Sequence, residues 1–260
     1  MEISKKQGVQ FRDLGQIEYR DAWDLQEKLL QENVAVKTEL RKRMAVLEEE
    51  AAIRDGQSAV NSFDNEGVAP STNHYLLFVE HPPVYTLGKS GAIEHVLISE
   101  EQRAAKGISF YHTNRGGDIT VHGKDQLVGY PILDLERFYT DIGKYLRNLE
   151  DVIIATMADY GLKGERSPGE TGVWLDAAIK GRERKICAMG IRCSRWVTMH
   201  GFAFNVNTDL TYFDYIIPCG IQNKQVTSME KELGRKVNME EVKERVKHHF
   251  MNVFDVELIS

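Results

Sequence analysis

Hydrophobic residues follow two kinds of spacing along the chain, and together these predict strands interspersed with helices. Residues 9–17 alternate loosely and predict an opening strand. From Tyr19 to Ala51 apolar residues recur mostly at three- and four-residue steps, which predicts one long helix or two helices broken near Asn33. The apolar run at residues 126–135 (QLVGYPILDL) predicts a strand buried on both faces.

Later segments extend this pattern. Residues 99–106 and 238–254 predict helices, and residues 108–112 predict a strand. A further helix is predicted from near Tyr139 to Tyr160, and its apolar face consists of Ile142, Leu146, Leu149, Ile153 and Met157. Because strands and helices are interspersed, we expect an α+β fold with a single domain spanning residues 1–260, in which helices flank a central mixed β-sheet.

The composition is that of one globular domain. The chain has 260 residues, of which 42% are hydrophobic and 28% charged. It contains no apolar run long enough to span a bilayer and no apolar segment typical of a secretory signal. Three cysteines without an export signal favour a reducing compartment, so we expect a cytoplasmic location. A net charge of −6 argues against nonspecific binding to nucleic acid.

One cysteine is a candidate nucleophile. Cys219 lies between Pro218 and Gly220, and this pair of neighbours predicts a sharp turn, since proline fixes one backbone dihedral and glycine frees the next. Lys185 heads the same stretch of chain, and a neighbouring ammonium lowers the pKa of a thiol from about 8.5 toward neutral. A lone cysteine is more often a buried structural residue, and we assign that role to Cys187 and Cys193.

No metal or nucleotide site is predicted. The three cysteines show no C-x-x-C spacing, and His248 and His249 have no third ligand at a metal-site spacing. The GKSG at residues 88–91 lacks the first glycine of a phosphate-binding loop, because Pro83 occupies that position. We therefore expect a protein without metal or cofactor.

Six blocks of sequence, taken in order, resemble the signature blocks of the octanoyltransferases of lipoate biosynthesis. They are HPPVYTLG (81–88), RGGDITVHG (115–123), QLVGYPILDL (126–135), KICAMGIR (185–192), HGFAFNVN (200–207) and PCGI (218–221). The resemblance implies the fold of the biotin and lipoate protein ligases. It also implies an enzyme, a lipoyl(octanoyl) transferase of the acyltransferase class.

The resemblance implies roles for individual residues. Cys219 matches the acyl-accepting nucleophile of the family and Lys185 its catalytic lysine. The residues implied to contact substrate are Arg115, Gly116, Gly117, Asp118, Ile119, Thr120, Val121, His122, Ala188, Met189, Gly190, Gly201, Phe202 and Ala203. In the turn after His122 the family usually has Pro-Gly where this chain has Lys124 and Asp125, so we expect a less constrained turn.

The implied reaction moves an octanoyl group from acyl carrier protein to a lysine of a lipoyl domain, through a thioester on Cys219, as the first step of protein lipoylation. The implied acceptors are the lipoyl domains of 2-oxoacid dehydrogenase complexes and the glycine cleavage H protein. Two other functions stay open. One is an ATP-dependent lipoate or biotin protein ligase of the same fold, and the other is a non-catalytic protein that binds acyl carriers or lipoyl domains.

Two surface segments have no assigned role from the resemblance. Residues 180–185 contain four cations and form either a solvated hairpin tip or a docking surface for the acidic acyl carrier protein. Residues 31–73 are expected to be an insertion relative to the family, comprising a highly charged helix and a loop. This insertion is either a solvated decoration or a surface for docking a partner or a second copy.

Overall fold

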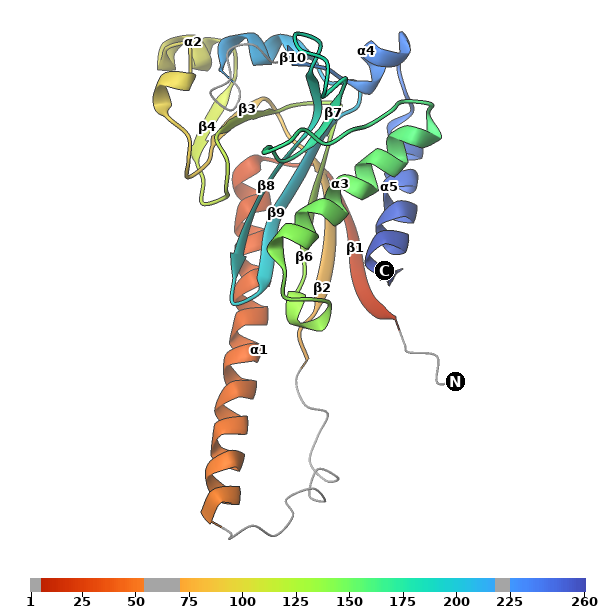
Figure 1. Ribbon diagram of the computed structural model, residues 1–260. Helices are drawn as coiled ribbons and strands as arrows, with labels where there is room; N and C mark the ends of the chain where they lie inside the picture. The colour runs from red at the N-terminus through yellow and green to blue at the C-terminus, as the bar shows by residue number, and fades with distance from the viewer. Residues whose placement is uncertain (1–5, 54–70, 218–224) are drawn as a thin grey trace.

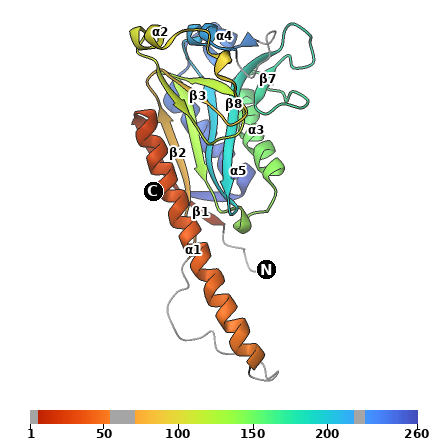
Figure 2. The ribbon, with the colours of Figure 1, turned by 90° about the vertical axis from the view of Figure 1, so that its left-hand side faces the viewer.

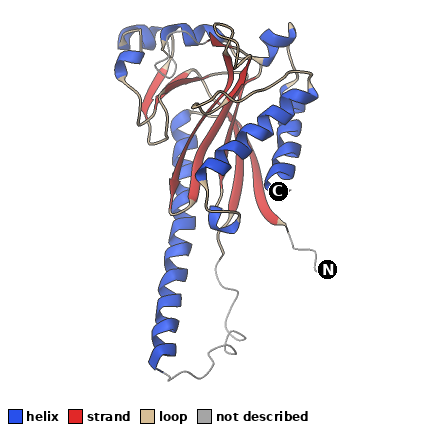
Figure 3. Ribbon diagram, viewed as in Figure 1, coloured by secondary structure: helices blue, strands red, loops and turns tan. Residues whose placement is uncertain are grey.

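The computed structural model describes residues 6–53, 71–217 and 225–260 (Figure 1). Cys219, its neighbours Pro218 and Gly220, and most of the loop predicted at residues 55–73 lie outside the described residues. Within the described residues a large mixed sheet and a small sheet account for all the strands (Figure 3).

The large sheet has eight strands in the described part of the chain, and seven of them follow the order β10-β8-β9-β6-β2-β1-β11. Their bounds are β10 (Gln225–Val226), β8 (Arg184–Ser194), β9 (Val197–Asn205), β6 (Gln126–Ile132), β2 (His74–Glu80), β1 (Gln7–Gln16) and β11 (Val256–Ile259). The eighth strand, β7 (Val173–Leu175), pairs with β8. β1 runs parallel to both of its neighbours, whereas β2, β6, β9 and β8 pair antiparallel in succession. The predicted mixed sheet is confirmed.

Helices cover both faces of this sheet (Figures 1 and 2). On one face, α3 (Ile142–Asp159) and α5 (Met239–Phe254) pack with side chains such as Phe78 and Phe204 into the largest apolar cluster. On the other face, α1 (Tyr19–Ile53) packs against residues such as Leu77 and Tyr130. β6 lies between these layers and every one of its residues is buried, which confirms the strand predicted to be covered on both faces.

The small sheet consists of β4 (Ser109–His112), β3 (Val84–Leu87) and β5 (Ile119–His122) in the order β4-β3-β5. α2 (Glu100–Ala105) precedes β4, and the hydroxyl of Ser99, the residue before the helix, caps its first turn. The Tyr85 hydroxyl donates to the carbonyl of Tyr212 at 2.8 Å, and Val96 bridges to Ile216. The first contact joins the small sheet, and the second joins the chain between β3 and α2, to the segment that precedes residue 218.

α1 is one continuous helix of 35 residues, so the alternative of a break near Asn33 is wrong. The Asn33 side chain faces the start of β2, donating to the carbonyl of Asn73 at 2.7 Å and accepting from its amide at 2.8 Å. Beyond this point the helix projects past the sheet (Figure 2), and Met44, Val46 and Leu47 are 60%, 53% and 48% exposed. Whether this extension is a decoration or a docking surface stays a prediction.

One residue of the predicted apolar face of α3 was placed wrongly. Ile142 is 39% exposed, because it is the first residue of the helix after the cap at Asp141, and the buried residues begin only at Tyr145. The remaining predicted positions line the core or the cavity described below. No helix in the described part of the chain is both long and apolar enough to cross a bilayer, and the cytoplasmic location stays a prediction.

Candidate functional site

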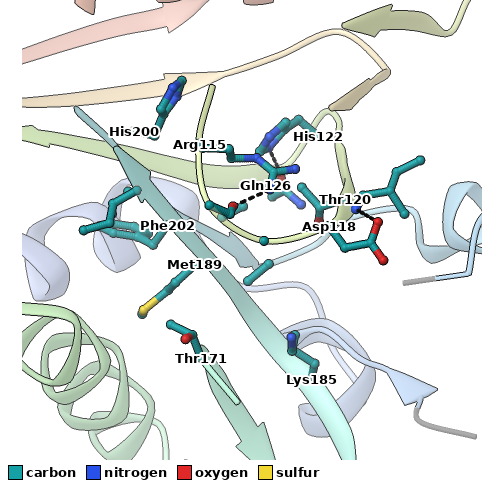
Figure 4. A pocket seen from close by; sticks show the side chains of 18 of the residues that line it. Arg115, Asp118, Thr120, His122, Gln126, Thr171, Lys185, Met189, His200 and Phe202 are labelled. Atoms are coloured by element: carbon teal, nitrogen blue, oxygen red, sulfur yellow. Dashed lines mark hydrogen bonds between the residues drawn. The ribbon is translucent and has the colours of Figure 1, made fainter. Parts of the chain in front are cut away.

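A cavity of about 460 Å³ lies between the small sheet and strands β8 and β9 of the large sheet. The loop at residues 115–118, β5, β8 and β9 supply most of its walls, and Tyr19 of α1 and Leu146 of α3 complete them. Figure 4 shows polar side chains such as Arg115 and His122 on one side, and Met189 and Phe202 on another. Segments far apart in the sequence therefore form one space with both polar and apolar walls.

The loop that begins at Arg115 is clamped between the two sheets. The buried Arg115 guanidinium donates to the carbonyl of Thr86 at 2.5 Å and to its hydroxyl at 2.9 Å. The amide of Gly116 donates to the carbonyl of Ile191 in β8 at 2.8 Å, and the amide of Lys89 donates to the carbonyl of Arg115 at 3.0 Å. These bonds hold the backbone of the loop at the rim of the cavity.

Two buried histidines lie near this loop: His122 lines the cavity and His81 lies behind it. His122 Nδ1 is 3.0 Å from Gln126 Oε1, and the Tyr19 ring stacks on the imidazole at a centroid distance of 5.8 Å. His81 Nε2 is 2.8 Å from the Tyr130 hydroxyl. Burial lowers the pKa of His81 to about 4 and, together with the charge on Arg115, lowers that of His122 well below 6.5. Both imidazoles are therefore neutral at neutral pH, and they act as hydrogen-bonding groups rather than cations.

His200 is a third neutral imidazole, at the cavity wall. Its Nε2 is 2.8 Å from Asn114 Oδ1, and its backbone amide donates to the Gln26 side chain of α1 at 2.9 Å. Burial and the charges of Arg115 and Arg192 lower its pKa to about 3. The residue has a φ of +59°, which is uncommon for a residue with a side chain. The hydrogen bond to Gln26 of α1 thus supports the unusual backbone conformation of His200 in β9, beside the cavity.

Lys185 is the cationic side chain at the β7 end of the cavity. It lies in β8, pairs with Trp174 of β7 and Val226 of β10, and lines the cavity. Its Nζ is 4.6 Å from the centroid of the Trp174 ring, a distance at which a cation is attracted to the ring face. The strand pairing and the ring contact fix the position of the ammonium group.

Hydrogen bonds from distant parts of the chain hold the turn after His122. Asp125, at the usual glycine position of the family, has a φ of +59°, a conformation that glycine adopts readily and aspartate tolerates. Its amide donates to Glu80 Oε2 at 2.9 Å, and its carbonyl accepts from the amide of Asn207 at 3.0 Å and the Thr208 hydroxyl at 3.2 Å. These tertiary hydrogen bonds hold Asp125 in place, and the comparison of this turn with the Pro-Gly turn of the family stays a prediction.

The basic segment at residues 180–185 is partly neutralised within the chain. Arg182 and Arg184 both bind Asp176, at 2.9 and 2.6 Å, and Arg184 also binds Glu232 at 2.6 Å. Lys180 is exposed. The Arg184–Glu232 pair links β8 to α4 (Met229–Leu233). Two of the cations predicted to dock the acyl carrier protein therefore form ion pairs within the chain.

Comparisons with known proteins assign this chain to a family. Residues 57–251 match the family described as the lipoyl protein ligase A/B catalytic domain. The octanoyltransferase of Christiangramia forsetii is 54% identical over 251 residues, covering 96% of this chain and 97% of that protein. The octanoyltransferase of Flavobacterium psychrophilum is 53% identical over 252 residues, covering 96% and 98%. The chain belongs to the octanoyltransferase family.

Solved structures agree with the fold of this octanoyltransferase. The putative lipoate protein ligase Ta0514 from T. acidophilum has a TM-score of 0.62 at 14% identity, covering 97% of this chain and 87% of that one. A lipoate-protein ligase A bound with ATP has a TM-score of 0.61 at 13% identity, covering 98% and 88%. The predicted ligase-like fold is therefore confirmed, and the octanoyltransferase is an enzyme of protein lipoylation.

The octanoyltransferase cavity brings together nearly all the residues that the resemblance implied. Lys185 and every implied contact residue except Val121 line it. Val121, between Thr120 and His122 of β5, does not line the cavity and is fully buried in the apolar cluster of the small sheet. The roles of the lining residues stay predictions.

Sequence reasoning about the octanoyltransferase missed several cavity residues. Tyr19, Leu146 and Tyr130 also line the cavity, but each belongs to a helix or strand whose own pattern explains it. Thr171, in the loop before β7, lines the cavity as well. His200 had a usable signal, since it is the first residue of the HGFAFNVN block. Cys219 lies outside the described residues, and Phe213 and Val226, which flank residues 218–224 in the sequence, line the cavity.

Proposed function

We propose that this octanoyltransferase transfers an octanoyl group from acyl carrier protein to a lysine of a lipoyl domain through a thioester on Cys219. The observation that carries the proposal is the position of Lys185. Its cationic side chain lines the same cavity as Phe213 and Val226, which precede and follow residues 218–224 in the sequence.

In the first step the Cys219 thiolate attacks the carbonyl carbon of the donor thioester. The carbon–sulfur bond to the phosphopantetheine arm breaks, and the carrier leaves as a thiol after taking up one proton. The acyl group is then held on Cys219 as a new thioester. An ammonium group near the thiol favours the reactive thiolate, and we assign this role to Lys185.

In the second step the ε-amine of a lipoyl-domain lysine attacks the acyl-enzyme. The new carbon–nitrogen bond forms an amide, the bond to Cys219 breaks, and the thiol is restored. The incoming lysine has an ordinary pKa of about 10.4, so it must lose a proton before it attacks. Lys185 is the candidate to relay that proton. Because the two substrates use one nucleophile in turn, ping-pong kinetics are expected.

The apolar wall of the cavity supports a medium-chain acyl substrate. Leu146, Met189, Ile191 and Phe202 line it. Burial of about six methylenes at roughly 0.8 kcal/mol each contributes on the order of 5 kcal/mol to binding. We propose lipoyl domains of 2-oxoacid dehydrogenase complexes and the glycine cleavage H protein as acceptors, and Lys180 as a residue that meets the acidic carrier.

Intact-protein mass spectrometry tests the proposal. The enzyme is mixed with octanoyl-acyl carrier protein without ATP, and Cys219→Ala and the matched control Cys193→Ala are treated in parallel. We expect one added octanoyl group on the wild type and on the control, none on Cys219→Ala, and discharge of the group when a lipoyl domain is added. Acylation of the lipoyl domain only with ATP and free octanoate would instead establish a ligase.

A further inference from the structure

Phe202 belongs to a row of directly paired residues that crosses four strands. Phe78 of β2 pairs with Gly129 of β6, Gly129 pairs with Phe202 of β9, and Phe202 pairs with Met189 of β8. Directly paired residues present their side chains on the same face of a sheet. Met189 and Phe202 line the cavity and lie side by side in Figure 4.

Gly129 leaves a gap in this row that the Phe202 ring fills. A Cβ atom added at Gly129 would lie 2.1 Å from Cζ of Phe202 and 2.4 Å from Cε1. The ring also makes an edge contact with Phe78, at a centroid distance of 6.4 Å and an interplanar angle of 74°. Phe202 is only 2% exposed. The ring therefore lies against the backbone of β6, and any side chain at position 129 would displace it.

This row of residues lies away from Lys185, the proposed catalytic residue of the cavity. Lys185 and Met189 are four residues apart in β8, a separation of about 13 Å at roughly 3.3 Å per residue. The apolar side chains Leu146, Met189, Ile191 and Phe202 line the cavity around the row. An acyl chain whose carbonyl lies near Lys185 would direct its methyl end toward Met189 and Phe202.

We propose that the Gly129–Phe202 contact sets the depth of the acyl cavity and so the chain-length preference of the enzyme. Gly129 does not line the cavity but lets the Phe202 ring withdraw from it, and the ring closes the apolar end. The inference rests on the proposed acyl transfer, because it requires that the acyl chain occupies this cavity.

The two sides of the contact can be changed in opposite directions. In Gly129→Ala the new methyl group pushes the Phe202 ring away from β6 and toward the cavity, which shortens the space. In Phe202→Leu the ring is removed and the space lengthens toward Gly129. A buried methylene is worth roughly 0.8 kcal/mol, or about fourfold in binding, so a change of two methylenes shifts preference by about 15-fold.

The experiment measures kcat/KM with hexanoyl-, octanoyl-, decanoyl- and dodecanoyl-acyl carrier protein. We expect the octanoyl-to-hexanoyl ratio to fall about 15-fold in Gly129→Ala and the decanoyl-to-octanoyl ratio to rise about 15-fold in Phe202→Leu. Val128→Ala is the matched control, since Val128 is buried beside Gly129 on the opposite face of β6. Its ratios should equal those of the wild type.

Two failures are distinguishable. If the wild type transfers octanoate without ATP but the ratios of both variants stay within about twofold of Val128→Ala, or move in the opposite directions, the inference about depth is overturned and the proposed function stands. If the wild type transfers no acyl group from any carrier, the proposed function fails. Thermal unfolding identifies a variant that has not folded, and the other variant then decides the question by the same ratios.

Discussion

The buried ion pair between Lys37 and Asp134 is expected to hold α1 on the sheet. Both side chains are 4% exposed, and the Lys37 ammonium contacts one oxygen of Asp134 and, at 2.9 Å, Glu136. The other oxygen of Asp134 accepts from the Thr72 hydroxyl at 2.9 Å. Replacing Lys37 by methionine keeps an unbranched side chain only one atom shorter but leaves the buried carboxylate without its cation.

The size of the effect follows from this burial. Removing one partner of a buried ion pair costs about 3–5 kcal/mol, because the remaining charge is neither solvated nor compensated. For a chain of 260 residues, 1 kcal/mol shifts the Tm by about 2–4 °C. Lys37→Met should therefore lower the Tm by about 6–20 °C. In the double variant Lys37→Met with Asp134→Leu most of that loss should be recovered, since neither charge is then buried alone.

Urea unfolding followed by circular dichroism measures the free energy of unfolding for each variant. Lys28→Met is the matched control: it makes the same substitution in the same helix at a side chain that is 72% exposed and 4.0 Å from Glu32, so its cost should stay below about 0.5 kcal/mol. The reasoning is refuted if Lys37→Met costs no more than Lys28→Met, or if the double variant is less stable than the single one.

Three further predictions concern the site and the pH dependence. A Cβ at Gly88 would lie 2.2 Å from the carbonyl oxygen of Gly117, so Gly88→Ala should displace the loop at the cavity rim and lower steady-state acyl transfer by about 100-fold; unchanged transfer would contradict this. His200, with a pKa of about 3, should show no protonation by NMR between about pH 8 and pH 5. In the unfolded chain the same imidazole takes up a proton below its ordinary pKa of 6.5. The free energy of unfolding should therefore fall as the pH drops below 6.5. Arg184 lowers the pKa of Glu232 below 4.5, so this pair stabilises the fold above that pH and loses its effect as the pH falls through the lowered pKa. In Arg184→Gln the free energy of unfolding should therefore fall less steeply as the pH drops below 4.5. An unchanged pH dependence would exclude this contribution.

Local pattern was sufficient to predict several elements of this fold. The apolar run of β6 predicted a strand covered on both faces, and all its residues are buried. The three- and four-residue spacing predicted α1, since side chains at that spacing lie on one face of a helix. The blocks around Arg115, Lys185 and Phe202 indicated the family and thereby most of the cavity walls. In each case the information lies within a few consecutive residues.

Tertiary contacts decided what no local pattern contains. Asp125 is held in a left-handed turn by Glu80 and Asn207, which are distant in the sequence. Ile142 has the spacing of a core residue, but the buried residues of its helix begin three positions later, at Tyr145. Gly129 is one small residue in an apolar strand, and its importance arises only because strand pairing places Phe202 directly beside it. A sequence specifies which face of an element is apolar, whereas the packing of elements determines which atoms meet there.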